Sequence, residues 1–146
     1  DVAPDFLALN NDLSPIKFSS FRGKICILSS VPSLDTPVCD METRRFNEEA
    51  GRLGADVVIL TISMDLPFAQ KRWCAATGTD KIQTFSDHRD ASFGTSYGVL
   101  IKELRLLARA VFLVDRKGTL QYMQMVKELT SEPDYGAILS ALKKLS

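Results

Sequence analysis

Hydrophobic and polar residues alternate along the chain in blocks that predict strands and helices in turn. Residues 25–31 and 57–63 are short apolar runs rich in β-branched side chains, which is typical of buried strands. Between them, residues 41–53 place apolar side chains such as Phe46 among Glu and Arg, the pattern of an amphipathic helix. The first half of the chain therefore predicts a strand, a helix and a strand.

The second half continues the alternation and then changes to a hairpin. A helix is expected over residues 66–77, because Pro67 suits its first turn and Gly78 its end. Later patterns predict, in chain order, a short strand (82–85), a turn (86–90), a small helix (91–97), an antiparallel hairpin (110–115 with 119–126) and a terminal helix (133–144). This order predicts an α/β fold, a three-layer thioredoxin-like arrangement with a mixed β-sheet flanked by helices, in a single domain over residues 1–146.

Composition and charge exclude several functions. The 18 basic and 18 acidic residues give a formal net charge of zero, so no overall field attracts nucleic acid or an anionic membrane. No apolar run approaches the roughly 20 residues that span a bilayer, and residues 1–6 lack an export signal. Three cysteines are too few for a disulfide scaffold, so we expect a reducing, cytoplasmic location.

The junction between the first strand and the first helix carries the best candidate for chemistry. If Thr36 is the N-cap, Pro37 is the first helical residue and Cys39 lies in the first turn. Unpaired N–H groups at a helix N-terminus favour the thiolate, which is the nucleophilic form of cysteine. Asp40 and Glu42 place negative charge nearby and oppose this effect, so a cation from elsewhere in the fold would help.

The other two cysteines have weaker claims. Cys26 lies in the middle of a predicted strand among apolar residues, which indicates core packing. Cys74, in a predicted helix beside Trp73, is by its local sequence more often a packing residue than a reactive one.

A nucleophilic cysteine without a histidine base narrows the reaction. The only histidine, His88, lies in a turn-like segment, which disfavours a Cys–His hydrolase and a metal site, and no Cys-x-x-Cys pair occurs. A thiolate can attack a peroxide without a base and become sulfenic acid, which a second thiol converts to a disulfide. Peroxide reduction therefore suits these residues, with no metal or organic cofactor.

Two segments resemble the peroxiredoxin family. Pro32, Thr36 and Cys39 match its Pro-x-x-x-Thr-x-x-Cys motif, and residues 106–112 resemble the segment that carries its active-site arginine, here Arg109. The chain is similar over nearly its whole length to the thiol peroxidase branch, an atypical two-cysteine group. Members of that branch begin upstream with an N-terminal hairpin that this sequence lacks, so a segment trimmed from the start is one explanation.

The resemblance implies a role for each of these residues. Cys39 would be the peroxidatic cysteine, Thr36 would position the peroxide, Pro32 would shield the sulfur from water, and Arg109 would hold thiolate and peroxide. Cys74 would be the resolving cysteine, which forms an intrachain disulfide with Cys39. The resemblance also implies hydrogen peroxide and organic hydroperoxides as substrates, thioredoxin as the reductant, and a homodimer formed by loops beside the active site.

Two alternatives remain open at this stage. In a one-cysteine peroxidase, Cys74 would only pack and an external thiol would resolve the sulfenic acid. In a non-enzymatic α/β binding module, all three cysteines would be inert. If the disulfide does form, two cysteines in separate helices are unsuited to the roughly 4.4–6.8 Å Cα spacing of a disulfide, so we expect both helix ends to unravel locally during turnover.

Overall fold

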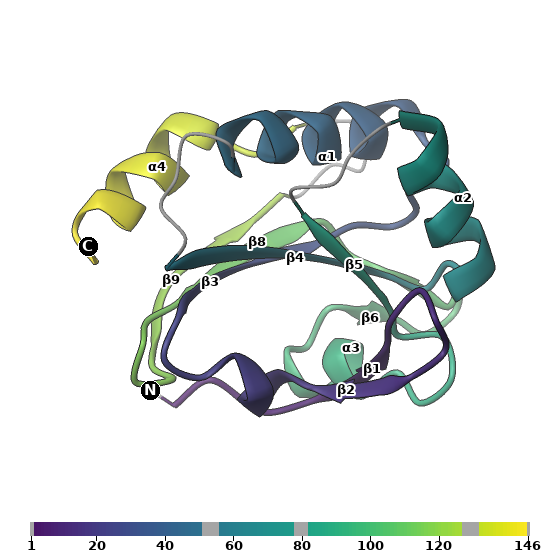
Figure 1. Cartoon of the computed structure of the whole chain (residues 1–146), viewed down its shortest axis with the longest axis horizontal. Helices are drawn as coiled ribbons and strands as arrows, with labels where there is room; N and C mark the ends of the chain where they lie inside the picture. Colours follow the sequence, from purple (N-terminus) through teal and green to yellow (C-terminus); the bar gives the residue numbers. More distant parts are fainter. Residues whose placement is uncertain (1, 51–55, 78–81, 127–131, 146) are drawn as a thin grey trace.

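A seven-stranded mixed sheet forms the centre of the computed structural model, which describes residues 2–50, 56–77, 82–126 and 132–145 (Figure 1). Its strands run in the order β2-β1-β5-β4-β3-β8-β9. They are β1 (Leu7–Leu9), β2 (Pro15–Lys17), β3 (Ile25–Ser30), β4 (Val57–Ser63), β5 (Gln83–Ser86), β8 (Ala110–Val114) and β9 (Leu120–Met125). A separate two-stranded sheet joins β6 (Leu100–Ile101) to β7 (Leu106–Leu107).

The helices cover both faces of the large sheet. They are α1 (Pro37–Ala50), α2 (Pro67–Thr77), α3 (Ser92–Ser96) and α4 (Tyr135–Lys143), with a 3-10 turn, η1, at Phe18–Phe21. In Figure 1, α1, α2 and α4 lie on one side of the central strands, whereas α3 and the β1–β2 hairpin, which forms one edge of the sheet, lie on the other. The expected three-layer α/β arrangement is confirmed. Within the described residues, no helix is long and apolar enough to cross a membrane.

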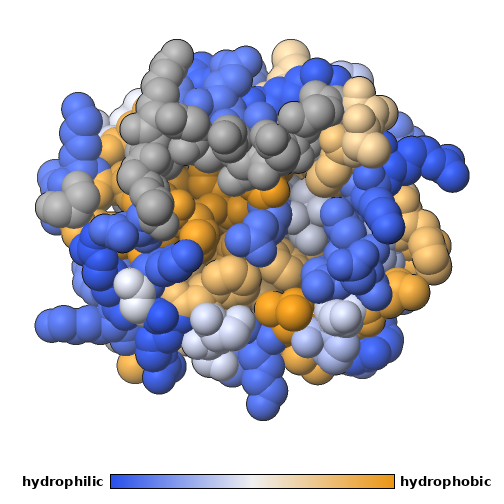
Figure 2. All heavy atoms as spheres, viewed as in Figure 1, coloured by the Kyte–Doolittle hydropathy of each residue, from blue (hydrophilic) through white to orange (hydrophobic). Residues whose placement is uncertain are grey.

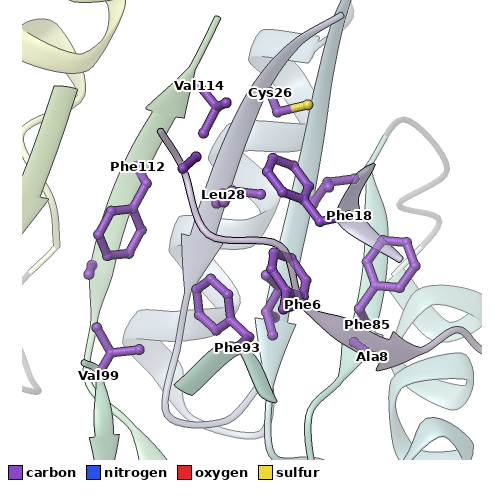
Figure 3. Packing of buried hydrophobic residues seen from close by; sticks show 14 of the residues in the cluster. Phe6, Ala8, Phe18, Cys26, Leu28, Phe85, Phe93, Val99, Phe112 and Val114 are labelled. Carbon is purple, nitrogen blue, oxygen red and sulfur yellow. The ribbon is translucent and has the colours of Figure 1, made fainter. Parts of the chain in front are cut away.

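The central strands are buried on both faces, which explains their nearly continuous apolar sequence. β3 pairs in parallel with β4 and antiparallel with β8. Its side chains alternate, so Ile25 and Ile27 pack in the cluster beneath α1 and α4, while Cys26 and Leu28 pack in the cluster on the opposite face. Figure 3 shows Cys26 toward one end of that second cluster. Figure 2 shows hydrophobic residues toward the centre of one face of the molecule, with hydrophilic residues around them.

Most predicted elements are present, with shifted ends. The strand over residues 57–63 and the antiparallel hairpin of β8 and β9 are confirmed. α1 begins at Pro37, the first helical residue expected with Thr36 as N-cap, and so extends the amphipathic stretch over residues 41–53 toward the N-terminus; the expected end at residues 51–53 lies outside the described residues. α4 begins two residues late, because the carboxylate of Asp134 caps it by accepting a hydrogen bond from the Ala137 N–H at 3.1 Å.

Four short strands were not predicted. β1 and β2 have three residues each, and β6 and β7 have two each, so none carries enough alternation to be recognised in sequence. The turn between β6 and β7 contains Leu104, which is 59% exposed and is not a core residue.

Candidate active site

The loop between β3 and α1 places Cys39 in the first turn of the helix, as predicted. Pro37 is the first helical residue, and the Thr36 carbonyl accepts the first helical hydrogen bond from the Asp40 N–H at 2.9 Å. The hydroxyl of Thr36 donates to the carbonyl of Ser33 at 3.0 Å. This bond fixes the direction of the hydroxyl, whose oxygen keeps a lone pair for another donor.

The sulfur of Cys39 is enclosed rather than open to solvent. Cys39 is 0% exposed and clusters with Val31 and Leu34, against which Trp73 packs. Pro32, which follows Val31 of this cluster in the sequence, is also buried. The reactive sulfur proposed from the motif therefore lies under an apolar cover.

Arg109, between β7 and β8, points into the protein and is 1% exposed. Its Nη1 lies 3.2 Å from Oε1 of Glu42, and Oε2 of Glu42 accepts a hydrogen bond from the Ser29 hydroxyl at 2.8 Å. From the sequence, Glu42 was expected only as a negative charge that opposes the Cys39 thiolate, and its pairing with Arg109 was not predicted. Glu42 lies one helical turn after Cys39, so the Arg109 guanidinium is bound to the N-terminal half of α1.

Burial dominates the ionisation of Glu42. Removal from water raises the pKa of Glu42 to about 7, while the hydrogen bond from Ser29 and the charge of Arg109 act in the opposite direction. A signal for this buried carboxylate exists in the sequence. Cys39, Glu42, Thr43 and Phe46 have the i, i+3, i+4, i+7 spacing of one helix face, and all four are buried.

A second carboxylate, which the sequence analysis also missed, organises the loop before α1. Oδ1 of Asp65 accepts from the Ser33 hydroxyl at 2.7 Å, and Oδ2 accepts from the Leu34 N–H and the Ser63 hydroxyl, both at 2.8 Å. Asp65 thus connects the loop that precedes Cys39 to the end of β4.

Cys74 lies in α2 and is partly buried as a free thiol. Its Sγ is 3.6 Å from Oγ1 of Thr84 in β5, and it lines a pocket of about 250 Å³ beside the β1–β2 hairpin. Cys39 and Cys74 are both free thiols, so no disulfide joins them in this structure. The preceding residue, Trp73, reaches α1 instead, where its indole N–H donates to Oδ1 of Asp40 at 2.8 Å.

A second pocket, of about 420 Å³, lies next to the enclosed sulfur. Its lining includes Leu34 and Trp73, which also pack in the cluster around Cys39, together with Asp65 and Arg72. The pocket and the cluster around Cys39 therefore share two side chains, those of Leu34 and Trp73.

Comparison with known proteins identifies several similar chains. The family model described as Redoxin matches residues 1–139. A thiol peroxidase of Oceanobacillus iheyensis is 58% identical over 144 residues, which cover 99% of this chain and 87% of the relative. A thiol peroxidase of Bacillus subtilis is 55% identical over 145 residues, covering 99% and 86%. The crystal structure of a peroxiredoxin-like protein from Aquifex aeolicus superposes with a TM-score of 0.92 at 38% identity, covering 100% of this chain and 86% of that one.

Proposed function

Because the chain belongs to the redoxin family and its relatives are thiol peroxidases, we propose that this peroxidase reduces hydrogen peroxide and organic hydroperoxides at Cys39. The observation that carries the proposal is the position of Cys39 in the first turn of α1, one turn before the Glu42–Arg109 pair. Helix N–H groups and a buried guanidinium both favour negative charge on a nearby sulfur or oxygen.

The first step oxidises the sulfur. The Cys39 thiolate attacks one peroxide oxygen, an S–O bond forms and the O–O bond breaks. The leaving oxygen takes up a proton and departs as water or as an alcohol, which leaves a sulfenic acid on Cys39.

Three further residues support this step. The Thr36 hydroxyl donates to Ser33, so its oxygen is oriented to accept the O–H of the peroxide. Arg109 would stabilise the charge that moves from sulfur to the leaving oxygen. Buried Pro32 would limit the access of water.

The second step forms a disulfide with Cys74. The Cys74 thiol attacks the sulfenic sulfur, the S–S bond forms and water leaves; the dithiol of thioredoxin then reduces the disulfide with two electrons and is itself oxidised. Contact between the two cysteine-bearing helices through Trp73 supports this pairing. Since Sγ of Cys74 faces Thr84, the end of α2 has to unravel before the sulfurs meet.

Substitution of each cysteine tests the assignment. Cys39→Ser is expected to lose thioredoxin-dependent peroxide turnover, whereas Cys26→Ala, the matched buried control, is expected to keep it. Turnover retained by Cys39→Ser would show that the assignment is wrong.

The orientation of Cys74 toward β5 favours one competing reading, in which an external thiol resolves the sulfenic acid. Cys74→Ser separates the two mechanisms. Loss of multiple turnover with thioredoxin, with one equivalent of peroxide still consumed, supports the intrachain disulfide. Full turnover supports the one-cysteine mechanism.

We also propose a reducing, cytoplasmic location and a homodimer. Both sulfurs return to thiols in every cycle, and a reducing compartment supplies the reductant for that step. Leu66 and Phe68 are 51% and 65% exposed at the start of α2, close in sequence to Asp65 and its bonds to the active-site loop. A dimer in solution that dissociates in Phe68→Glu would support an interface there; a monomeric wild type would exclude it.

A further inference from the structure

A hydrogen bond joins the residues next to the two reactive cysteines. Asp40 follows Cys39, Trp73 precedes Cys74, and the indole N–H donates to the Asp40 carboxylate at 2.8 Å. Nε of Arg44 binds the other carboxylate oxygen at 2.9 Å, which fixes Asp40 on α1. Trp73 therefore ties the last turns of α2 to the first turn of α1.

Trp73, rather than Cys74, is the α2 residue that packs against the cluster containing Cys39. Successive residues of an α-helix point about 100° apart, so neighbouring side chains face different directions. Trp73 packs against the cluster of Val31, Leu34 and Cys39, whereas Sγ of Cys74 lies beside Thr84 in β5. Cys74 cannot replace Trp73 at Cys39 while this part of α2 stays helical and the indole stays in place.

The beginning of α2 is anchored separately. Gln70 is 1% exposed, and its Nε2 donates to the Ser63 hydroxyl at 3.0 Å and to the Phe85 carbonyl at 2.8 Å. These bonds attach the first turn of α2 to β4 and β5. Beyond Gln70, both the contact between Trp73 and α1 and that between Cys74 and Thr84 have to break for Cys74 to move toward Cys39, and the first of them is the one that reaches the helix of Cys39.

We propose that Trp73, held by Asp40, is a positioning residue that keeps the end of α2 folded while Cys39 reacts, and that its release limits disulfide formation. This inference rests on the proposed Cys39–Cys74 disulfide. The unwinding is confined to the part of α2 after Gln70.

The proposal has a chemical consequence for the sulfenic acid. It can condense with Cys74, which forms the S–S bond and releases water. Alternatively, as the sulfenate, it can attack a second peroxide, which forms another S–O bond, breaks the O–O bond and yields sulfinic acid with water or an alcohol. A tighter contact between Trp73 and Asp40 slows the first route and so favours the second.

Four variants isolate the contact. Trp73→Phe keeps an aromatic ring but removes the N–H, and Asp40→Ala removes the acceptor. Asp40→Asn keeps an oxygen that can accept the indole N–H, and Arg44→Gln, the matched control, removes only the partner ion pair of Asp40. Each reduced protein is mixed with one equivalent of hydrogen peroxide, quenched at intervals, and its disulfide is quantified by mass spectrometry; sulfinic acid is quantified after excess peroxide.

The expected result is disulfide formation about tenfold faster in Trp73→Phe and Asp40→Ala, the factor that corresponds to loss of one hydrogen bond to a charged group, with less sulfinic acid. Asp40→Asn should stay within about threefold of the wild type, since a weaker hydrogen bond to a neutral oxygen is retained, and so should Arg44→Gln, since the carboxylate that accepts from the indole is unchanged. An unchanged or slower rate in both contact-breaking variants overturns the proposal. A wild type that forms no Cys39–Cys74 disulfide overturns the resolving role of Cys74 as well, so the two failures are distinguishable.

Fluorescence gives a second readout, because Trp73 is the only tryptophan in the sequence. Its emission should shift to longer wavelength as the disulfide forms, since the indole leaves a partly buried site. The shift should be absent in Cys74→Ser after peroxide addition. An emission spectrum identical in the reduced and disulfide forms of the wild type would contradict release of Trp73.

Discussion

Arg109 and Glu42 form an ion pair that is almost completely removed from water, with exposures of 1% and 0%. Burial of two charges carries a desolvation cost that their attraction offsets only when further hydrogen bonds satisfy them. Glu42 has such a bond from Ser29. A stabilising role alone gives little reason to bury a guanidinium at this place, whereas stabilisation of charge during peroxide attack gives a direct one.

Arg109→Lys tests that role. Lysine keeps the positive charge but lacks the planar set of donors that can bind two partners at once. We expect kcat/KM for peroxide to fall by about 10²–10³-fold, the range for loss of one preorganised donor. Arg116→Lys, at an exposed ion pair with Asp56, is the control and should stay near wild-type activity. Unchanged kcat/KM in Arg109→Lys would remove Arg109 from the mechanism.

Glu42 should make stability depend on pH. Its pKa is about 7 in the folded protein against 4.5 as the ordinary value, so the folded state binds this proton more tightly. The free energy of unfolding that Glu42 contributes is therefore highest below pH 4.5, falls as pH rises toward about 7, and is constant above it, with a total loss on the order of 3 kcal/mol.

Urea denaturation of the wild type and Glu42→Gln between pH 4 and 8 measures this effect, because glutamine does not titrate. Relative to the variant, the wild type should become less stable as pH rises through this window. Glu48→Gln on the exposed side of α1 controls for the substitution itself. A difference between wild type and Glu42→Gln that does not vary with pH would contradict the prediction.

At the scale of elements, α2 is held by different partners at its beginning and toward its end. Gln70 binds β4 and β5, whereas Trp73 binds α1. Local stability follows such contacts, so one helix can unwind in part without loss of the whole.

Amide hydrogen exchange of the reduced and disulfide forms tests this division. In the disulfide form, the amides of Trp73 to Ala76 should exchange about tenfold faster or more than in the reduced form, and the exchange rate of the Gln70 amide should not change. Partial unfolding of one helix end exposes only the amides of that end. The first turn of α1 around Cys39 should also lose protection. Equal protection in the two redox states would contradict local unravelling.

The packing of α3 depends on a residue without a side chain. A Cβ at Gly94 would lie 2.7 Å from Cδ2 of Leu107 in β7, which is too close, and 3.1 Å from Cβ of Leu100 in β6, which is a tight contact. Gly94→Ala should lower the free energy of unfolding by about 1–3 kcal/mol, the usual cost of overpacking. Gly136→Ala in α4, whose nearest neighbour is an Asp134 oxygen at 3.5 Å, is the control and should be neutral or slightly stabilising. Equal stability of Gly94→Ala and wild type would show that this packing relaxes easily.

At the scale of the whole molecule, the sheet separates two apolar clusters, and β3 contributes to both. Cys26 lies in this strand at 1% exposure, and burial raises its pKa to about 12. Its thiol is therefore both covered and protonated in the folded protein, in contrast to the reactive role proposed for Cys39.

Thiol labelling should follow this difference. In increasing urea, modification of Cys26 should coincide with the global unfolding transition recorded by circular dichroism, because exposure of β3 requires the sheet to separate. Modification of partly buried Cys74 should occur without global unfolding. Rapid labelling of Cys26 in the absence of denaturant would contradict the assignment of β3 to the stable core.

Local sequence determined the elements that carry the site and the position of the sulfur within them. The apolar runs of β3 and β4, the Pro37 start of α1 and the hairpin of β8 and β9 depend on neighbours within a few residues, which is the range that periodicity and capping describe. The short strands β6 and β7 were missed because two residues show no period.

Only the tertiary structure decided which side chains meet along the N-terminal half of α1, the helix that carries Cys39. Glu42 and Arg109 are 67 residues apart in sequence, and Asp40 and Trp73 are 33 apart, so neither contact has a local signature. A charged residue on a helix is in contact with solvent in most proteins. The sequence of α1 alone therefore does not show that a buried cation from a distant segment binds Glu42. Packing of α1 against the sheet and the end of α2 brings these partners together, and burial strengthens the contact between Glu42 and Arg109.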